Sequence, residues 1–524
     1  MAAVVMILLA APDAGAVEYP VTDEVKASLL SNKVNDRDLA ITLLGEDPGP
    51  GAGVLLAALL NGNLYYSKDD ETFFVRNESA AGWLSLQTGE TVGEAPGLKK
   101  VGINNRQRET LVGLVNGRSL KDPDVRVRRE ASRTLAANNP LPASFLKELA
   151  ATETDGRVLA NYGKALAVMS LKDPAATKEE VLGALKVLKE RLTPEARELI
   201  RERTLDEDPD VRLAANGALA GMEATLEHLA LFETIFFGLS LGSVLVLIAI
   251  GLAITFGVMG VINMAHGEMV MLGAYTAWFS QTLLPGRPGL ALILAVPGAF
   301  LVAGLAGGII ERGVIRFLYA RPLETLLATF GISLILQQAV RTFISTNNRP
   351  VETPAFMSGR WFLTEHFSVA QGRLYIIFFC LLVFFAILFV MKKTRLGLEV
   401  RAVTQNRDMA RAMGIKSSRV DTMTFVLGSG AAGMAGVALS QLANVGPNLG
   451  QNYIVDCFMV VVFGGVGNLW GTLTGGLVIG MANKFLEPFS GAILGKILIM
   501  VGVILFIQRH PSGLFPQKGR ASRS

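Results

Sequence analysis

Residues 231–508 contain a series of apolar segments whose lengths approach or reach that of a membrane-spanning helix. About 20 helical residues are needed to cross a hydrocarbon core roughly 30 Å thick. The segments are 232–258, 262–284, 289–310, 324–344, 374–391, 423–443, 454–467, 469–486 and 492–508. Because lipid offers no partner for backbone N–H and C=O groups, spanning segments of this kind are helical. We therefore expect an all-α polytopic membrane protein with about eight or nine transmembrane or re-entrant segments over 231–508.

A basic segment interrupts these runs and orients them. Residues 392–419 carry eight Lys or Arg side chains against two acidic ones. Because Lys and Arg are concentrated in cytoplasmic loops of membrane proteins, segment 392–421 is predicted to be cytoplasmic. Alternating crossings then place the basic residues of 312–321 and the tail 509–524 inside, and the loop 345–373 outside.

Residues 1–16 are predicted to be a signal peptide. A short apolar stretch precedes Ala14-Gly15-Ala16, a small-x-small triplet that suits cleavage by signal peptidase. The lack of Lys and Arg in this stretch argues against cleavage, and the alternative is an apolar start to a cytosolic domain. Cleavage would make residues 17–230 an exported domain.

The two halves of the chain differ in charge. Residues 1–230 contain 27 Lys and Arg against 34 Asp and Glu, whereas residues 231–524 contain 22 against 11. The basic excess lies in loops beside apolar segments, so it indicates membrane topology and not binding to nucleic acid. Both cysteines lie in apolar runs. The N-terminal half offers no nucleophile–base pair or metal cluster, so we expect no enzyme and no metal site.

The N-terminal half has helical periodicity and one short duplicated sequence. Asp-Pro-Asp-Val-Arg occurs at 122–126 and again at 208–212, each time before an alanine-rich helical pattern. Asp followed by Pro favours the start of a helix. The spacing is twice 43, a period typical of helical-hairpin repeats, and 155–167 is a weak middle copy. We predict a mainly helical, HEAT-like domain; the alternative is an irregular helical domain with two similar caps. A small β-hairpin is expected at 64–75.

Two polar, glycine-containing stretches interrupt the apolar segments. Asn263-Met-Ala-His-Gly-Glu268 would be costly in lipid unless it faced protein or water. It is interpreted either as a broken helix beside a solute path or as an interfacial turn. The stretch 453–471 is interpreted either as path lining or as glycines that allow close helix packing. The candidate path residues are Asn263, His266, Glu268, Asp456, Gly464, Gly465, Gly467 and Asn468.

The cytoplasmic segment has the pattern of a docking helix. Residues 395–415 are predicted to form one amphipathic helix that ends at Gly414, with Val400, Val403, Met409, Ala412 and Met413 available for an apolar face. A segment that served only as a topology signal would need only the charges. The ordered Ala-x-Met-Gly-Ile ending favours contact with a partner.

Three motifs in the membrane half resemble the Liv-type family of ABC importer permeases. They are Gly260-Val-Ile-Asn-Met-Ala-His-Gly-Glu268 with Met271–Tyr275, Arg401–Asn406 with Met413-Gly-Ile415, and Gly464-Gly-Val-Gly-Asn468. The resemblance covers essentially all of 232–516. The amino-acid sequences of 453–456 and 463–470, together with the long N-terminal domain, resemble those of the urea-transport branch of this family.

The resemblance implies a bacterial inner-membrane complex. Its other members would be a second, similar permease, two cytoplasmic ATPase subunits and an extracytoplasmic solute-binding protein. The sequence contains no Gly-x-x-x-x-Gly-Lys-Ser/Thr, so ATP would be used by partner subunits and this chain would hold no cofactor. The implied ATPase-coupling residues are Glu399, Arg401, Ala402, Asn406, Ala412, Met413, Gly414 and Ile415.

Other solutes and other classes of protein stay open at this point. Branched-chain amino acids or short amides would replace urea in an otherwise identical importer. A passive solute channel would share the apolar spans but would not need a shaped cytoplasmic helix. A sensor receptor would need few spans and a cytoplasmic output domain.

Overall fold

The computed structural model describes residues 22–515 apart from 32, 68–71, 78–81, 87–90, 93–96, 136–140, 320 and 363–366. The predicted signal peptide, residues 1–16, lies outside the described residues. The chain forms two compact units, one up to Leu226 and one from Glu227 onwards. This division falls within one helix, α11 (Pro209–Met259), so the two units share that helix.

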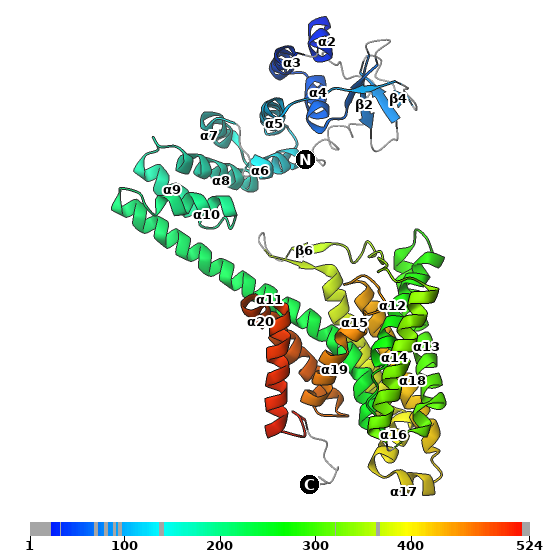
Figure 1. Ribbon diagram of the computed structural model, residues 1–524. Coiled ribbons are helices and arrows are strands. Elements are labelled where there is room, and N and C mark those ends of the chain that lie inside the picture. The colour runs from blue at the N-terminus through cyan, green and yellow to red at the C-terminus, as the bar shows by residue number, and fades with distance from the viewer. Residues whose placement is uncertain are drawn as a thin grey trace. The chain divides into compact units, whose positions relative to one another are not determined.

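Helices dominate the first unit (Figure 1). They are α2 (Asp23–Leu30), α3 (Val34–Glu46), α4 (Pro50–Asn61), α5 (Asn105–Ser119), α6 (Val125–Leu135), α7 (Ala143–Thr152), α8 (Gly156–Lys172), α9 (Lys178–Leu188), α10 (Pro194–Arg203) and the start of α11. Capping boxes begin two of them, with Asn104 and Gln107 at α5 and Thr177 and Glu180 at α9. Each box pairs otherwise free N–H groups with side-chain oxygens.

The β-hairpin expected at 64–75 is confirmed, but it belongs to a larger sheet that we did not predict. β1 (Leu64–Tyr66) and β2 (Phe73–Asn77) pair antiparallel, with Leu64 opposite Val75. With β3 (Gly82–Ser85), β4 (Thr91–Val92) and β5 (Lys99–Lys100) they form a five-stranded sheet of order β4-β3-β2-β1-β5. The added strands are two to four residues long, which is too short for an alternating pattern to be recognised.

The duplicated sequence starts two equivalent helices, α6 and α11. In both copies the first Asp accepts a hydrogen bond from the backbone N–H of the second, Asp122 from Asp124 N and Asp208 from Asp210 N, each at 2.8 Å. The weak middle copy corresponds to α8, whose first N–H groups bond to the Asp155 carboxylate. However, α6, α8 and α11 begin 31 and 53 residues apart. The regular 43-residue period is therefore wrong for these helices, because segments of unequal length separate them.

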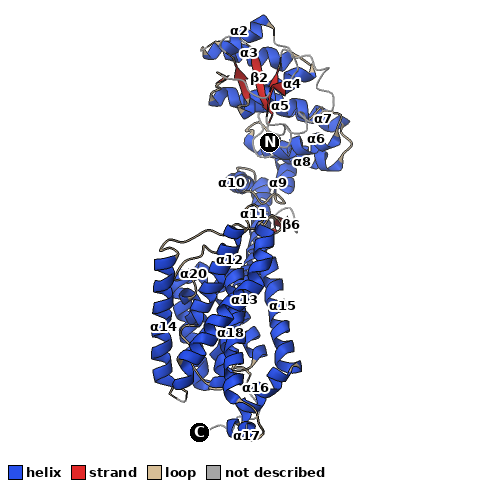
Figure 2. Cartoon of the chain, turned by 90° about the vertical axis from the view of Figure 1, so that its right-hand side faces the viewer, coloured by secondary structure: helices blue, strands red, loops and turns tan. Residues whose placement is uncertain are grey.

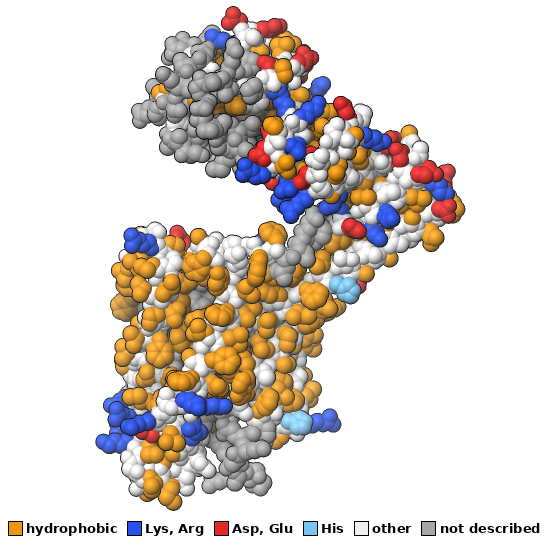
Figure 3. Space-filling model, turned by 180° about the vertical axis from the view of Figure 1, so that it is seen from behind, with side chains coloured by type: hydrophobic (Ala, Val, Ile, Leu, Met, Phe, Trp, Pro, Cys, Tyr) orange, Lys and Arg blue, Asp and Glu red, His pale blue; other side chains and the backbone are white. Residues whose placement is uncertain are grey.

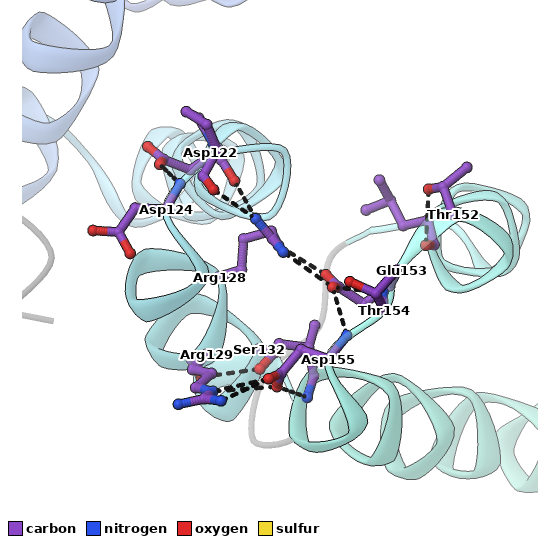
Figure 4. Close-up of polar contacts among 12 residues, drawn as sticks. Asp122, Asp124, Arg128, Arg129, Ser132, Thr152, Glu153, Thr154 and Asp155 are labelled. Atoms are coloured by element: carbon purple, nitrogen blue, oxygen red, sulfur yellow. Dashed lines mark hydrogen bonds and ion pairs between the residues drawn. The ribbon is translucent and has the colours of Figure 1, made fainter.

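Two ion pairs join α6 to the turn before α8 (Figure 4). Arg128 Nε lies 2.8 Å from Glu153 Oε2, and Arg129 Nη2 lies 2.6 Å from Asp155 Oδ2. Hydrogen bonding from Arg129 lowers the pKa of Asp155 to about 2. These ion pairs attach α6 to the turn between α7 and α8.

The second unit is a helical bundle with one short hairpin (Figures 1 and 2). Its elements are the rest of α11, α12 (His266–Leu283), α13 (Pro288–Gly313), the 3₁₀ turn η1 (Ile315–Phe317), α14 (Pro322–Phe343), β6 (Arg360–Phe362), β7 (Ser368–Ala370), α15 (Gln371–Lys393), α16 (Arg395–Gln405), α17 (Arg407–Ala412), α18 (Ser417–Ser440), α19 (Gln451–Gly464) and α20 (Leu469–Arg509). The α11 stretch 244–254 is almost wholly buried and forms the centre of the apolar core.

Within the described residues, six helices are long and apolar enough to cross a membrane. They are α11, α13 with η1, α14, α15, α18 and α20. Hydrophobic side chains cover the face of this unit seen in Figure 3, and Lys and Arg gather towards one end. A polytopic helical membrane unit is thereby confirmed, whereas the expected total of eight or nine segments is not. The 14 residues of α19 span only about 21 Å.

Helix α20 reverses direction at Gly491, whose φ of 75° lies in the left-handed region. Before this residue, α20 runs antiparallel to α19, because Gly471 meets Gly464 whereas Gly475 meets Val460. After it, α20 runs parallel to α19, because Lys496 pairs with Asp456 and Phe506 stacks on Phe463. The expected separation of 469–486 from 492–508 is therefore present as a sharp turn.

The two long connections lie at opposite ends of the second unit (Figure 1). Backbone hydrogen bonds between Arg349 and Val445 tie the connection after α14 to that after α18. At the other end, α17 contacts the segment after α13 through Arg407 and Tyr319. This arrangement meets the requirement of the predicted topology, in which 345–373 and 392–421 lie on opposite sides of the membrane.

Candidate functional site

The first polar stretch forms a break between two buried helices. α11 ends at Met259, Gly260 adopts a positive φ of 67°, and α12 begins at His266. Asn263 and His266 are fully buried. The break is fixed by two hydrogen bonds: Ala265 N donates to Asn263 Oδ1 at 3.0 Å, and Met264 N donates to Thr329 Oγ1 at 3.1 Å. These polar groups lie inside the protein, which is how a break in a spanning helix is tolerated.

Glu268 is the centre of a buried polar network. Its Oε1 accepts hydrogen bonds from Ser333 Oγ and Gln337 Nε2 of α14, both at 2.8 Å. Gln337 Nε2 also donates to Gln451 Oε1 of α19 at 3.0 Å. Glu268 therefore links α12 to α14, and Gln337 extends the network to α19. Sequence reasoning missed Ser333, Gln337 and Gln451, although polar residues within an apolar segment such as 324–344 were an available signal.

The contacts of the His266 ring are those of a residue that packs helices together. Its Nε2 lies 3.0 Å from the Ile248 carbonyl oxygen. Because a carbonyl only accepts, this nitrogen carries the proton and donates. The ring also lies against the close crossing of α11 and α18, where a Cβ on Gly251 would come within 2.8 Å of His266 and 2.2 Å of the Gly428 oxygen. These contacts give His266 a role in packing of the broken helix.

The glycines of 464–471 form a tight helix–turn–helix. A Cβ on Gly464 would lie 2.2 Å from the Gly471 oxygen, so α19 and α20 touch through their backbones. Gly465 and Gly467 form the turn, with φ of 101° and 80°. Asn468 caps α20, since its Oδ1 accepts hydrogen bonds from the backbone N–H groups of Trp470 and Gly471. This arrangement supports the close-packing interpretation for Gly464.

Asp456 lies in a different place from these glycines. It is only 6% exposed, and its Oδ2 lies 2.9 Å from Lys496 Nζ. The ion pair lines an open cavity of about 480 Å³, near the end of the unit where α14 and α18 end. Sequence reasoning missed the other lining residues because they come from distant segments. They include Asn348, Asn444, Asn452, Asn483, Lys484, Glu487 and Lys496.

The structure thus separates the predicted path residues into three groups. Asn263, His266 and Glu268 lie around the buried break, and Asp456 lies at the open cavity. Gly464, Gly465, Gly467 and Asn468 form the turn near the C-terminal tail, where Asn468 Nδ2 donates to the Phe515 oxygen at 3.3 Å. The first two groups approach each other through α19, because Gln451 bonds to Gln337 whereas the neighbouring Asn452 lines the cavity.

The predicted single helix over 395–415 is wrong. It is two helices, α16 and α17, separated at Asn406, whose φ of −151° and ψ of 102° are extended. The Asn406 side chain accepts from Met409 N at 3.0 Å and caps α17. Asparagine favours the N-cap position, and this signal was present in the sequence. Gly414 ends the pair with a φ of 87°.

The pair α16–α17 is held firmly on the bundle. Val400 and Val403 of α16 and Ala410 of α17 are buried against Val420 of α18. Arg407 bonds to both Asp421 and Tyr319, and its guanidinium lies over the Tyr319 ring. The pair is therefore attached to α18 by both apolar and charged contacts.

Some of the predicted coupling residues attach α16–α17 to the bundle, and others are exposed to solvent. Arg401 donates to the Met391 carbonyl, Ala402 accepts from Asn406 N at 3.0 Å, and Ile415 packs under the pair. Glu399 is half-buried, whereas Ala412, Met413 and Gly414 are exposed. The large exposed apolar side chains on this pair are Leu398, Met409 and Met413, at 62%, 61% and 77%.

Comparison with known proteins identifies the second unit. The family model described as branched-chain amino acid transport system / permease component matches residues 234–507. The high-affinity branched-chain amino acid transport system permease protein LivH of Escherichia coli K12 is 30% identical over 300 residues, which is 55% of this chain and 96% of LivH. The corresponding protein BraD of Pseudomonas aeruginosa is 30% identical over 289 residues, which is 53% of this chain and 93% of BraD.

A more distant relative transports a different solute by name. The ribose import permease protein RbsC of Escherichia coli K12 is 25% identical over 271 residues, which is 50% of this chain and 80% of RbsC. No solved structure matches the chain. The family match covers slightly more than half of the chain and nearly all of the second unit. This chain belongs to the branched-chain amino acid transport system permease family.

Proposed function

We propose that the second unit forms half of the translocation path of an ATP-driven importer in the bacterial inner membrane. A second, similar permease supplies the other half, and an extracytoplasmic solute-binding protein delivers the solute. Two separate cytoplasmic ATPase subunits supply the energy, because the sequence contains no phosphate-binding loop of the Gly-x-x-x-x-Gly-Lys-Ser/Thr type. The first unit, in this proposal, is extracytoplasmic and the C-terminus is cytoplasmic.

The observation that carries this proposal is the construction of α16–α17. Its inner face is anchored by apolar packing and by Arg407, while its outer face exposes Leu398, Met409 and Met413 to solvent. Exposed apolar side chains on a rigid, capped helix pair are typical of a surface that fits a partner's groove. A passive channel would have no use for such a surface.

Urea is the proposed solute. It is supported by the resemblance of 453–456 and 463–470, and by the additional N-terminal unit, to the urea-transport branch. Branched-chain amino acids are the second candidate, because LivH and BraD carry that name. Uptake of labelled urea and labelled leucine, measured with and without this chain in otherwise identical cells, distinguishes the two.

We also propose that the Glu268 network and the Asp456 cavity lie along the path. Asp456 supports this best, because a buried carboxylate at an open cavity is accessible to solute. Asn263, His266, Gly464, Gly465, Gly467 and Asn468 would then shape the path by holding its helices. Cysteine substitution of Asp456, followed by labelling with a water-soluble thiol reagent from outside, tests whether this position is reached from the extracytoplasmic side.

The coupling role is tested by charge at the exposed tip. Met413→Asp and Ala412→Arg are expected to abolish uptake while leaving membrane insertion intact, because each places a charge on the apolar docking face. Ser418→Asp is the control, since Ser418 is exposed at the start of α18 outside the pair. Copurification of the ATPase subunits should fall for the first two variants only. Normal uptake with a normally assembled complex would refute the coupling assignment.

A further inference from the structure

The cavity beside Asp456 combines two features that determine what it can bind. Its volume of about 480 Å³ lies in the range of small-molecule sites. It is lined from five segments of the second unit, namely α11, the connections after α14 and α18, helix α19, and α20 on both sides of its reversal. Converging side chains from separate elements are the usual construction of a ligand site.

The charged side chains of this cavity neutralise one another. Asp456 Oδ2 lies 2.9 Å from Lys496 Nζ, and Glu487 Oε2 lies 2.6 Å from Lys484 Nζ. Among the described lining residues these four are the only charged ones. A zwitterionic solute would need an unpaired cation for its carboxylate and an unpaired anion for its ammonium. This cavity offers neither without breaking an existing pair.

The carboxamides of the cavity, in contrast, are free. Asn348, Asn444, Asn452 and Asn483 all line it, and within the described part of the chain their side chains make no hydrogen bond. Asn483 is only 6% exposed and lines the cavity. Each carboxamide presents two N–H donors and one carbonyl acceptor. A ligand with complementary carbonyl and N–H groups can therefore bond to several of these carboxamides at once.

We propose that this cavity is where the permease receives its solute, and that it selects a small neutral molecule with a carbonyl group and several N–H groups. Urea and short amides have this chemistry, whereas a branched-chain amino acid does not. The inference rests on the proposed importer function and adds the site and the class of solute to it. The ion pairs hold the walls of the cavity, and the asparagines bind the solute.

The test uses the complete transporter, reconstituted in vesicles with its ATPase subunits and saturating solute-loaded binding protein. Asn483→Leu and Asn452→Leu each remove the donors and the acceptor while keeping a side chain of similar shape. Asn347→Leu is the matched control, because Asn347 is exposed in the same connection as Asn348 but does not line the cavity. The measured quantity is labelled urea imported per ATP hydrolysed.

We expect this ratio to fall about 2- to 10-fold in both cavity variants, as for the loss of one hydrogen bond each, and to stay at the wild-type value in the control. ATP hydrolysis stimulated by the loaded binding protein should persist, which a variant that had lost its fold would not show. If Asn483→Leu does not assemble, Asn452→Leu decides, because Asn452 is exposed and tolerates replacement.

Two failures are distinguishable. If the wild-type complex imports urea but both cavity variants keep its ratio, the cavity assignment is overturned and the importer proposal stands. If the wild-type complex imports labelled leucine and not urea, the neutral-solute inference is overturned together with the proposed solute.

Discussion

Replacing Gly450 with alanine isolates one backbone contact on which the polar network depends. Gly450 has a helical conformation, with φ of −70° and ψ of −37°, so alanine introduces no backbone strain there. A Cβ at this position would lie 1.7 Å from the Gly267 oxygen and 2.4 Å from its carbonyl carbon. Both atoms belong to backbone, so no side chain can rotate away. The start of α12 and the start of α19 must therefore separate.

The cost of this separation follows from the contacts that it breaks. Overpacking of a well-packed interior typically costs about 1–3 kcal/mol. Gln451, the next residue, would also move away from Gln337, with a further loss of about 1 kcal/mol for that hydrogen bond. We therefore expect Gly450→Ala to reduce the free energy of unfolding by about 2–4 kcal/mol.

The assay is thermal unfolding of the purified complex in detergent, with Gly331→Ala as the matched control. Gly331 lies within α14, and a Cβ there would meet nothing within 4 Å. Alanine at an open helical position is expected to be neutral or to stabilise by up to about 1 kcal/mol. The two substitutions should therefore shift the midpoint in opposite directions, or only Gly450→Ala should shift it. An equal midpoint for both variants would show that α12 and α19 do not pack as described.

Two further expectations follow from the polar contacts. Asn406→Ala removes the cap of α17 and should weaken that helix by about 1 kcal/mol, seen as faster amide hydrogen exchange in α17 but not in α16; unchanged exchange in α17 would contradict the capping role. The Arg129–Asp155 pair makes the first unit sensitive to acid. The pKa of Asp155 in the folded protein, about 2, lies below its ordinary value of about 3.9. The pair therefore stabilises the fold above pH 4, and this contribution is lost as the pH falls through 2. Limited proteolysis of the full-length protein between pH 5 and 2 should show a smaller acid sensitivity for Asp155→Asn, with the part due to Glu153, whose pKa is lowered by the Arg128 hydrogen bond, remaining; an unchanged pH profile would contradict the assignment.

The apolar pattern predicted which segments are helical but not how the chain runs between them. The pattern separated 469–486 from 492–508, but hydropathy reports only a preference for lipid, so the direction of each part of α20 against α19 comes from the contacts of Gly471, Lys496 and Phe506. The prediction of a continuous helix at 395–415 failed for a different reason. Periodicity continues through Asn406, and only its capping preference distinguishes a break from a helix interior.

The candidate site was predictable only where polar residues interrupt an apolar run. Glu268 and Asp456 stand out in the sequence for this reason, and both prove to be buried. Their partners do not stand out as a group, since the two residues that bond to Glu268 lie 65 and 69 positions away from it and the residues that line the cavity come from several segments. Proximity of this kind is set by helix packing, which a single sequence does not encode locally.

Helix α19 joins the closed polar network to the open cavity. Its first residue, Gln451, bonds to Gln337 within the Glu268 network, and its second, Asn452, lines the cavity. One turn further, Asp456 holds Lys496. Because these residues share one rigid helix, a displacement of α19 that releases Gln337 also moves the cavity wall. A change driven from α16–α17 would reach both sites together if it moved α18 and α14 against α19, which is what alternating access to a bound solute requires.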